Sequence, residues 1–133
     1  MSYPKNYRYT AEHEWVAAPE NGRARIGITD YAQHALGDIV FVELPAAGAH
    51  LEAGQPLGTV ESVKAVSEVF APVSGTVTAV NTSLSAHPEL INQDPHAGAW
   101  MVEVQLDDAA PLDKLMDATR YEAFIAEEQT GKA

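Results

Sequence analysis

The chain contains no cysteine among its 133 residues. Disulfides, thiolate metal sites and cysteine nucleophiles are therefore excluded, and any sulfur redox chemistry must be brought in by a group that the polypeptide does not encode. Basic residues are scarce too, because 8 Lys and Arg stand against 19 Asp and Glu, for a formal charge of −11. This charge disfavours nucleic acid and anionic membrane surfaces as partners, since both would repel the chain.

Long apolar runs are also missing. No stretch of about eighteen apolar residues occurs, and residues 1–10 have neither the apolar core of a signal peptide nor the arginine-rich pattern of a mitochondrial presequence. We therefore expect a cytoplasmic bacterial protein and disfavour a mitochondrial origin. The length suits one domain. We expect that domain to span residues 1–133, with residues 107–133 forming a helical C-terminal extension packed on it.

Motifs that indicate an enzyme are absent from the sequence. His13-Glu14 lacks the second histidine of a zinc-protease helix, and neither a glycine-rich phosphate loop nor a nucleophile elbow occurs. The five histidines are scattered without the spacing of metal ligands. We therefore expect neither a catalytic residue nor a metal site.

The apolar residues are spaced mainly for strands. Alternation is clearest in Trp100–Leu106, where Trp100, Val102, Val104 and Leu106 are expected to share one face. Further strands are expected at Tyr7–Thr10, Glu14–Ala17, Arg23–Ile28, Ile39–Leu44 and Thr76–Val80. The sequence therefore predicts a mainly β fold.

Helices are expected in two places. Thr29 or Asp30 caps a short helix that runs to Leu36 and is ended by Gly37. In the tail, a helix is expected over Ala109–Met116, and Thr119 to Glu122 has the spacing of a capping box ahead of a second helix. Residues 81–99, which hold two prolines, are expected to form an irregular excursion.

One lysine stands out, because Lys64 is the only lysine between Lys5 and Lys114. It lies between two segments rich in strand formers, so we expect it at the tip of a β-hairpin. Pairing Val63 with Val66 would leave Lys64 and Ala65 as the central turn residues. The tip lacks the Asn-Gly or Asp-Gly signal of tight hairpins. Residue chemistry alone leaves open that Lys64 is an ordinary exposed lysine without a function.

The phrases around and beyond Lys64 resemble the glycine cleavage system H-protein family. The resemblance covers residues 7–106, and the phrases occur in the family's order. They are Tyr9-Thr10-Ala11-Glu12-His13-Glu14-Trp15-Val16, Gly27-Ile28-Thr29-Asp30-Tyr31-Ala32-Gln33, Leu36-Gly37-Asp38-Ile39-Val40-Phe41-Val42-Glu43-Leu44-Pro45, Glu61-Ser62-Val63-Lys64-Ala65, Pro72-Val73-Ser74-Gly75, Val80-Asn81, Pro88-Glu89-Leu90-Ile91-Asn92 and Pro95.

The resemblance implies a fold, a cofactor and recognition residues. The fold would be a lipoyl-type barrel-sandwich hybrid with a short inserted helix and C-terminal helices. Lipoate would be attached to Lys64 through an amide, so the chemistry would belong to the cofactor and the chain would be a non-catalytic carrier. Glu61 and Gly75, three before and eleven after the lysine, would help the lipoylating enzyme to select it. From the residues alone, Glu61 is a strand-surface charge and Gly75 is a turn residue with positive φ.

The resemblance also implies a set of partners. The arm would carry the aminomethyl group of glycine from the pyridoxal-phosphate glycine decarboxylase (P protein) to the folate-dependent aminomethyltransferase (T protein). The reduced dithiol would then pass to dihydrolipoyl dehydrogenase (L protein). A lipoate ligase or a lipoyl or octanoyl transferase would load the lysine, and a shuttle of this kind is most simply a monomer.

A cleft beside the hairpin is the last feature that the resemblance implies. It would shelter the loaded arm from water with carboxylates at Glu14 and Glu68, and with Glu12 nearby. Solvated surface charge is the alternative for these three residues. Position 68 departs from the family pattern, since a shorter Asp is common there.

Three other functions remain open from the sequence. An H-like protein acting only as a lipoyl donor in lipoate relay would have the same motifs. A lipoyl or biotinyl carrier domain of an acyltransferase or carboxylase would share the hairpin, but biotin carriers favour methionine beside the lysine, where this chain has Val63 and Ala65. A β-rich interaction domain without a cofactor is the third.

Overall fold

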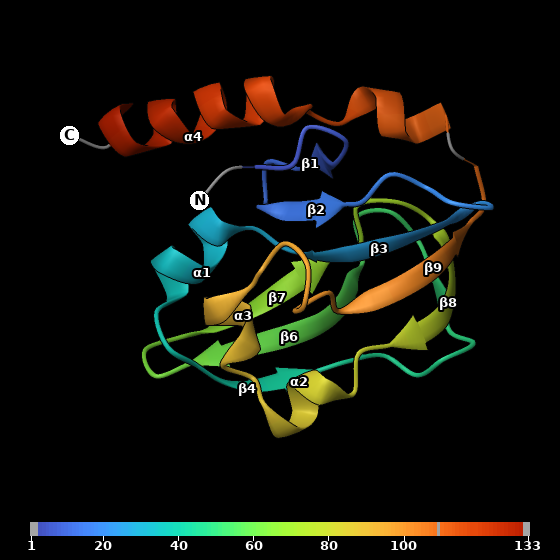
Figure 1. Ribbon diagram of the computed structural model, residues 1–133, viewed down its shortest axis with the longest axis horizontal. Coiled ribbons are helices and arrows are strands. Elements are labelled where there is room, and N and C mark those ends of the chain that lie inside the picture. The colour runs from blue at the N-terminus through green and yellow to red at the C-terminus, as the bar shows by residue number, and fades with distance from the viewer. Residues whose placement is uncertain (1–2, 109, 132–133) are drawn as a thin grey trace.

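Two antiparallel sheets form the body of the molecule in the computed structural model, which describes residues 3–108 and 110–131 (Figure 1). The larger sheet has six strands in the order β1 (Arg8–Tyr9), β2 (Glu14–Val16), β3 (Arg23–Ile28), β9 (Val102–Leu106), β8 (Gly75–Val80) and β5 (His50–Leu51). The smaller sheet has three strands in the order β4 (Ile39–Glu43), β6 (Pro56–Ser62) and β7 (Val66–Phe70). The prediction of a mainly β fold is confirmed.

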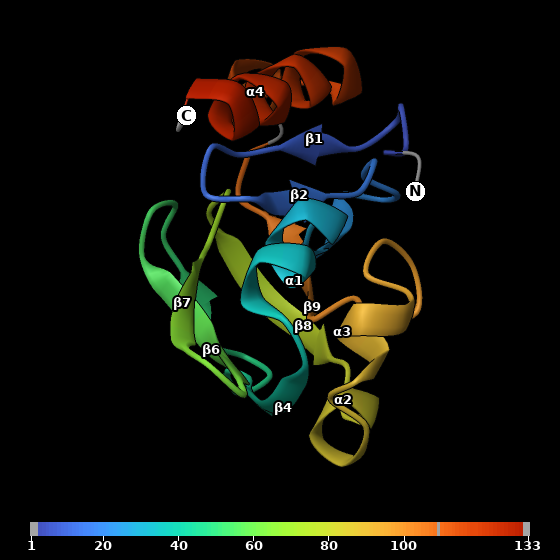
Figure 2. The same ribbon diagram turned by 90° about the vertical axis from the view of Figure 1, so that its left-hand side faces the viewer.

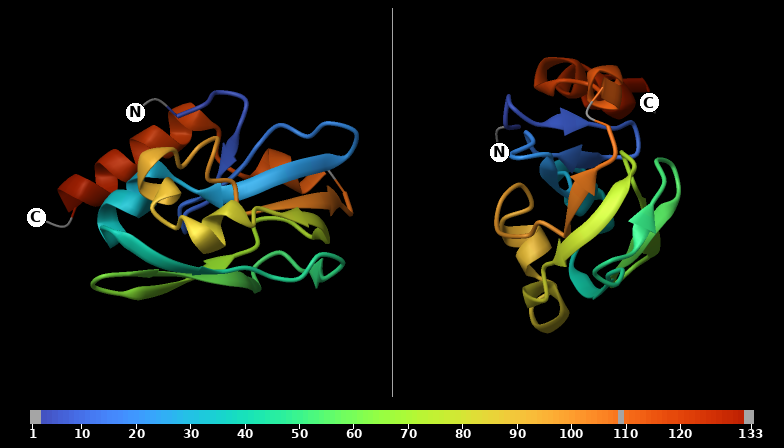
Figure 3. Two further views of the ribbon diagram at one scale, coloured as in Figure 1. Left: turned by 60° about the horizontal axis from the view of Figure 1, so that its bottom comes forward. Right: turned by 90° about the vertical axis from the view of Figure 1, so that its right-hand side faces the viewer.

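The core lies between the two sheets, which face each other in the views of Figure 3. Val60 and Val69 of the smaller sheet share one buried cluster with Ile26, Val77 and Val104 of the larger sheet. The alternation of β-branched residues produces this arrangement, because every second side chain of a strand points to the same face.

Helix α1 (Asp30–Leu36) begins and ends where the sequence predicts. The side chain of Thr29 accepts a hydrogen bond from the amide of Ala32 at 3.2 Å, which caps the first turn. Gly37 ends the helix with a φ of 84°, a conformation that glycine adopts without steric cost.

The excursion over residues 81–99 is less irregular than predicted. It contains two single-turn helices, α2 (Ser83–Ala86) and α3 (Leu90–Gln93). Leu84 of α2 and Ile91 of α3 are fully buried in the main core. Each short helix is therefore fixed to the sheets by one apolar side chain.

The C-terminal segment departs from its prediction at two points. The helix expected over Ala109–Met116 is instead a 3-10 helix, η1 (Ala110–Lys114), and Ala109 itself lies outside the described residues. The final helix, α4, spans Ala118–Gly131. Its first turn is capped by Asp117, whose carboxylate accepts a hydrogen bond from the amide of Arg120 at 2.8 Å, so the predicted capping box at Thr119 is wrong.

Helix α4 covers strands β1 and β2 at one edge of the larger sheet, as Figure 2 shows. Tyr9, Trp15, Ala118 and Tyr121 form a second buried cluster there, in which the rings of Tyr9 and Tyr121 stack with centroids 4.8 Å apart. Trp100 belongs to the margin of this cluster and precedes β9, so the prediction that it shares one strand face with Val102, Val104 and Leu106 is wrong. The other three alternating residues of β9 are buried as predicted.

No helix within residues 3–108 and 110–131 has both the length and the apolar character that crossing a bilayer requires.

Candidate functional site: the lysine hairpin

Strands β6 and β7 form the predicted hairpin, but its register differs from the prediction. Glu61 pairs with Val66, and the amide of Ser62 donates to the carbonyl of Ala65 at 2.8 Å. The central turn residues are therefore Val63 and Lys64, and the predicted pairing of Val63 with Val66 is wrong.

The side chain of Ser62 explains this register. Its Oγ atom accepts hydrogen bonds from the amides of Lys64 at 3.3 Å and of Ala65 at 3.1 Å. A serine hydroxyl that bonds to amides two and three residues ahead forms a turn without the Asn-Gly pair that tight hairpins otherwise favour. Ser62 is buried, and sequence reasoning missed its role.

Lys64 is exposed at the hairpin tip. No carboxylate of the described residues lies within ion-pair distance of its ammonium group. Val63, which precedes it, and Val66, two residues after it, are 69% and 68% exposed, which is unusual for large apolar side chains. The amine is therefore open to a macromolecular partner that also covers apolar surface.

The hairpin tip is tied to the loop that joins α1 to β4. The amide of Val63 donates to the carbonyl of Asp38 at 3.0 Å. The stem of Lys64 passes over Gly37, the residue before Asp38. Its Cε atom lies 3.6 Å from the point that a Cβ of Gly37 would occupy. The direction in which Lys64 leaves the molecule thus depends on residues 37–39.

The two predicted recognition residues occupy different parts of the structure. Glu61 is exposed on the outer face of the smaller sheet, where it pairs with Phe41 on one side and Val66 on the other. Gly75 opens β8 and is separated from Lys64 by the length of β7, which is roughly 17 Å for a five-residue strand.

Close backbone packing explains why glycine occupies position 75. A Cβ on this residue would lie 2.5 Å from the carbonyl oxygen of Gln105 on β9. Its φ is not among the positive values, so the expectation of a turn glycine with positive φ is wrong. Glycine is required here because two strand backbones approach closely.

The three carboxylates assigned to the arm cleft differ in their surroundings. Glu14 is 3% exposed and accepts hydrogen bonds from the Thr10 hydroxyl at 2.7 Å and the Phe70 amide at 3.1 Å. Burial raises the pKa of Glu14, the two hydrogen bonds oppose that shift, and the nearby charge of Glu12 adds to it. Glu12 and Glu68 are exposed.

Glu12 is close enough to Glu14 for its charge to act on the buried carboxylate. Glu68 lies on β7 two residues before Phe70, the strand residue that Glu14 holds. No contact joins the carboxylates of Glu14 and Glu68 within the described part of the chain. Two surface hollows of about 450 and 470 Å³ lie elsewhere, beside β1 to β3, with Arg8 lining one and Arg25 the other.

Two facing sheets with one lysine at the tip of an exposed hairpin are the architecture of a lipoyl-type domain. A family model described as glycine cleavage H-protein matches residues 7–128. The chain therefore belongs to the glycine cleavage H-protein family.

Individual relatives agree with the family match. The chain is 58% identical over 128 residues to a glycine cleavage system H protein of Acidobacterium capsulatum, which covers 96% of this chain and 98% of that one. It is 57% identical to the H protein of Brevibacillus brevis, covering 96% and 100%. A crystal structure of an H protein from Mycobacterium marinum superimposes with a TM-score of 0.83 at 40% identity, covering 97% of this chain and 99% of the other.

Proposed function

We propose that this chain is the lipoyl carrier of a glycine cleavage system, with lipoate attached through an amide to Lys64. The observation that supports this most directly is the exposed lysine at the tip of a hairpin, in a chain that belongs to the H-protein family. The alternatives of an acyltransferase lipoyl domain and of a cofactor-free interaction domain have no comparable support.

The residues of the hairpin fit the cofactor. Attachment needs a primary amine that an enzyme can reach, and the amine of Lys64 is exposed and free of ion pairs among the described residues. Both turn neighbours, Val63 and Ala65, lack long or charged side chains that would obstruct acylation. When bound, lipoate would supply a disulfide that accepts a one-carbon group and two electrons.

The chain's own residues would hold and present the arm. The Ser62 hydroxyl and the Asp38 carbonyl fix the hairpin tip, so the attachment point is rigid while the arm beyond it is flexible. Glu61, exposed three residues before the lysine, is proposed to be a contact by which the lipoylating enzyme recognises it. Glu14 and Glu68, with Glu12 nearby, are proposed to line the surface against which the arm rests.

The partners follow from the family. We propose that the carrier visits a glycine decarboxylase, an aminomethyltransferase and a dihydrolipoyl dehydrogenase, acts as a monomer and performs no catalysis itself. The relatives described above come from bacteria, which supports a cytoplasmic location. We also propose that residues 1–133 form one carrier domain with residues 107–133 as its helical extension.

The test is the intact mass of the protein before and after incubation with lipoate, ATP and a lipoate ligase, with Lys64→Arg in parallel. We expect one lipoyl increment on the wild type and none on the variant. No increment on the wild type, in a tube where a control acceptor is loaded, would refute the carrier function. Reconstitution of glycine cleavage with the three enzymes then separates the carrier of this system from a protein that only donates lipoate in relay.

A further inference from the structure

We infer that Asn92 is a positioning residue that sets the geometry in which the hairpin presents Lys64. This inference rests on the proposed function, because it assigns a residue to the presentation of the lipoyl lysine. Asn92 lies in α3, and the chain between the hairpin and α3 includes strand β8 and helix α2.

The side-chain amide of Asn92 forms hydrogen bonds through both its nitrogen and its oxygen. Its Nδ2 atom donates to the side-chain oxygen of Gln33 at 2.9 Å and to the carbonyl of Gly37 at 2.9 Å. Its Oδ1 atom accepts from the amide of Ile39 at 2.9 Å. An amide is the one side chain of this size that offers two donors and an acceptor from the same planar group.

Two of these three bonds flank Asp38. Gly37 and Ile39 are its chain neighbours, so Asn92 holds the peptide groups on both sides of it. The carbonyl of Asp38 is the acceptor for the amide of Val63. A fixed Asp38 carbonyl therefore fixes the turn residue next to Lys64.

The same loop carries the lysine stem. Gly37 holds a φ of 84° while the Cε atom of Lys64 lies over it. The bond from Asn92 to the Gly37 carbonyl restrains this loop conformation. Loss of that bond would release both the hydrogen-bond partner of Val63 and the surface on which the stem of Lys64 rests.

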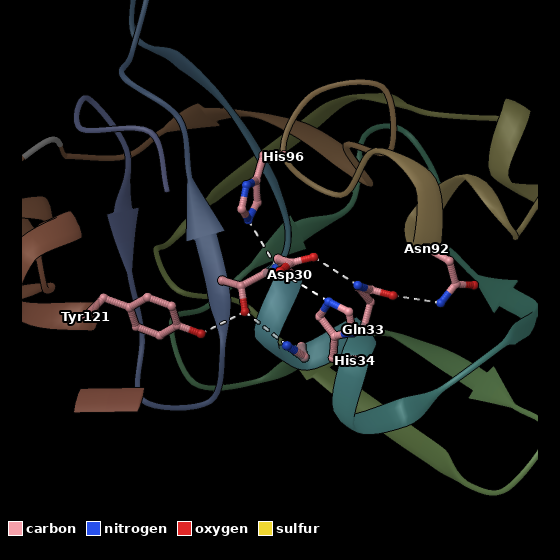
Figure 4. A network of polar contacts seen from close by, with 8 residues as sticks. Asp30, Gln33, His34, Asn92, His96 and Tyr121 are labelled. Atoms are coloured by element: carbon pink, nitrogen blue, oxygen red, sulfur yellow. Dashed lines mark hydrogen bonds and ion pairs between the residues drawn. The ribbon is translucent and has the colours of Figure 1, made fainter. Parts of the chain in front are cut away.

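Asn92 is itself held by a chain of polar contacts that Figure 4 shows in part. Gln33 donates to the carboxylate of Asp30 at 2.9 Å, and the amide of Asp30 donates to Nε2 of His96 at 3.1 Å. At the start of the same helix, the Thr29 hydroxyl contacts that of Tyr121 at 2.7 Å. Helix α1 thereby connects α4 to the Asn92 side chain, and its C-terminal end cannot shift alone without breaking the partly buried hydrogen bonds to Asn92.

The decisive measurement is hydrogen exchange of the Val63 amide in the unmodified full-length protein, followed by NMR. In Asn92→Ala we expect this amide to exchange roughly tenfold faster than in the wild type, as for the loss of an ordinary hydrogen bond. The Val104 amide, in the middle of the larger sheet, should keep its rate. We also expect kcat/KM for loading by a lipoate ligase to fall by a similar factor, roughly tenfold.

Asn81→Ala is the matched control. Asn81 is buried, whereas Asn92 is partly buried, and like Asn92 it donates from its side chain to a backbone carbonyl, that of Gly98 at 3.0 Å. Its side-chain hydrogen bond does not involve residues 37–39. It should leave the Val63 amide and the loading rate at wild-type values. If Asn92→Ala behaves like Asn81→Ala in both measurements, the inference is wrong. If the wild type accepts no lipoate at all, the carrier function fails, and the Val63 exchange rates still decide whether Asn92 positions the hairpin.

Discussion

The carboxylate of Glu14 accepts a hydrogen bond from the backbone amide of Phe70 at 3.1 Å. Glu14 belongs to β2 of the larger sheet, whereas Phe70 ends β7, an edge strand of the smaller sheet. The Thr10 hydroxyl donates to the other carboxylate oxygen at 2.7 Å. A single buried carboxylate thus joins the larger sheet to β7, one of the two strands of the lysine hairpin.

Glu14→Gln should change the pH dependence of stability. Burial raises the pKa of Glu14 in the folded protein, so the folded state binds a proton more readily than the unfolded chain. The stability that this group contributes therefore falls as the pH rises from the ordinary glutamate pKa through the folded pKa. Gln cannot titrate, so we expect the free energy of unfolding of the wild type, relative to Glu14→Gln, to be higher at acidic than at neutral pH.

Urea unfolding of both proteins at the two pH values measures this difference. All other carboxylates are common to the pair, so their titration cancels. A relative stability that is equal at the two pH values, or that favours the wild type more at neutral pH, would contradict the raised pKa.

Gly75→Ala should destabilise the fold by about 1–3 kcal/mol, because overpacking of this kind has that cost. The new Cβ would meet the backbone carbonyl of Gln105, which cannot move without displacing β9. Gly58→Ala should have a similar cost, since its Cβ would collide with the backbone carbonyl oxygen of Glu43. Gly98→Ala is the control, because its Cβ would meet mainly the end of the Asp94 side chain.

Gly75→Ala also distinguishes a packing role of this glycine from a direct role in recognition by the lipoylating enzyme. Chemical unfolding gives the stability, and the loading rate by a lipoate ligase is then compared at equal folded fraction. A Gly75→Ala protein with wild-type stability and a much reduced loading rate would overturn the packing explanation and support a direct role in recognition.

The parts of the fold that follow from local chemistry were predictable from the sequence. Helix α1 is the clearest case, because Thr29 supplies a cap and Gly37 supplies the left-handed conformation that ends it. The burial of Val102, Val104 and Leu106 in β9 was predictable too, because alternating apolar residues of a strand share one face. Lys64 was identified by its isolation and by the family resemblance of its neighbours.

The errors arise where a contact distant in sequence decides between local alternatives. Asp117 and Thr119 are both competent caps, and the burial of Ala118 and Tyr121 against β1 and β2 determines which one starts α4. The hairpin register depends on a serine side chain that folds back over the turn. Asn92 carries no local signal for its role, because its partners lie more than 50 residues away.

Asp107→Asn should lower the pKa of His50. The imidazole of His50, on β5, lies 2.7 Å from the Asp107 carboxylate that follows β9, and this hydrogen bond raises the pKa of His50. Removing the charge should return that pKa toward its ordinary value. NMR titration of the His50 ring measures the change, with Glu52→Gln as a control that should lower it less, since Glu52 acts only through a longer contact of 3.4 Å.

The sign of the linked stability follows from the raised pKa. The ion pair contributes while His50 is protonated, so its contribution is complete below the ordinary histidine pKa and is lost as the pH rises through the folded value. Because the pair is exposed, added salt should weaken the effect. A His50 pKa that is unchanged in Asp107→Asn would show that the hydrogen bond is not formed in solution.

Ser62→Ala should loosen the hairpin tip without disturbing the sheets. The substitution removes the acceptor of the Lys64 and Ala65 amides, so both should exchange with solvent several-fold faster, corresponding to about 1 kcal/mol of lost local stability. The turn has no glycine and no Asn-Gly pair to replace it. We therefore expect kcat/KM for loading by a lipoate ligase to fall, because the enzyme would meet an ensemble of tip conformations instead of one.

Ser67→Ala is the matched control, because its hydroxyl contacts only the carbonyl of the next residue, Glu68, at 3.4 Å. It should leave the exchange of the tip amides and the loading rate unchanged. If Ser62→Ala loosens the tip but is loaded at the wild-type rate, the ligase itself orders the turn on binding, and a preformed tip is not what makes Lys64 a substrate. If loading falls together with the protection of the two amides, the serine hydroxyl is part of what distinguishes this lysine from every other lysine of the chain.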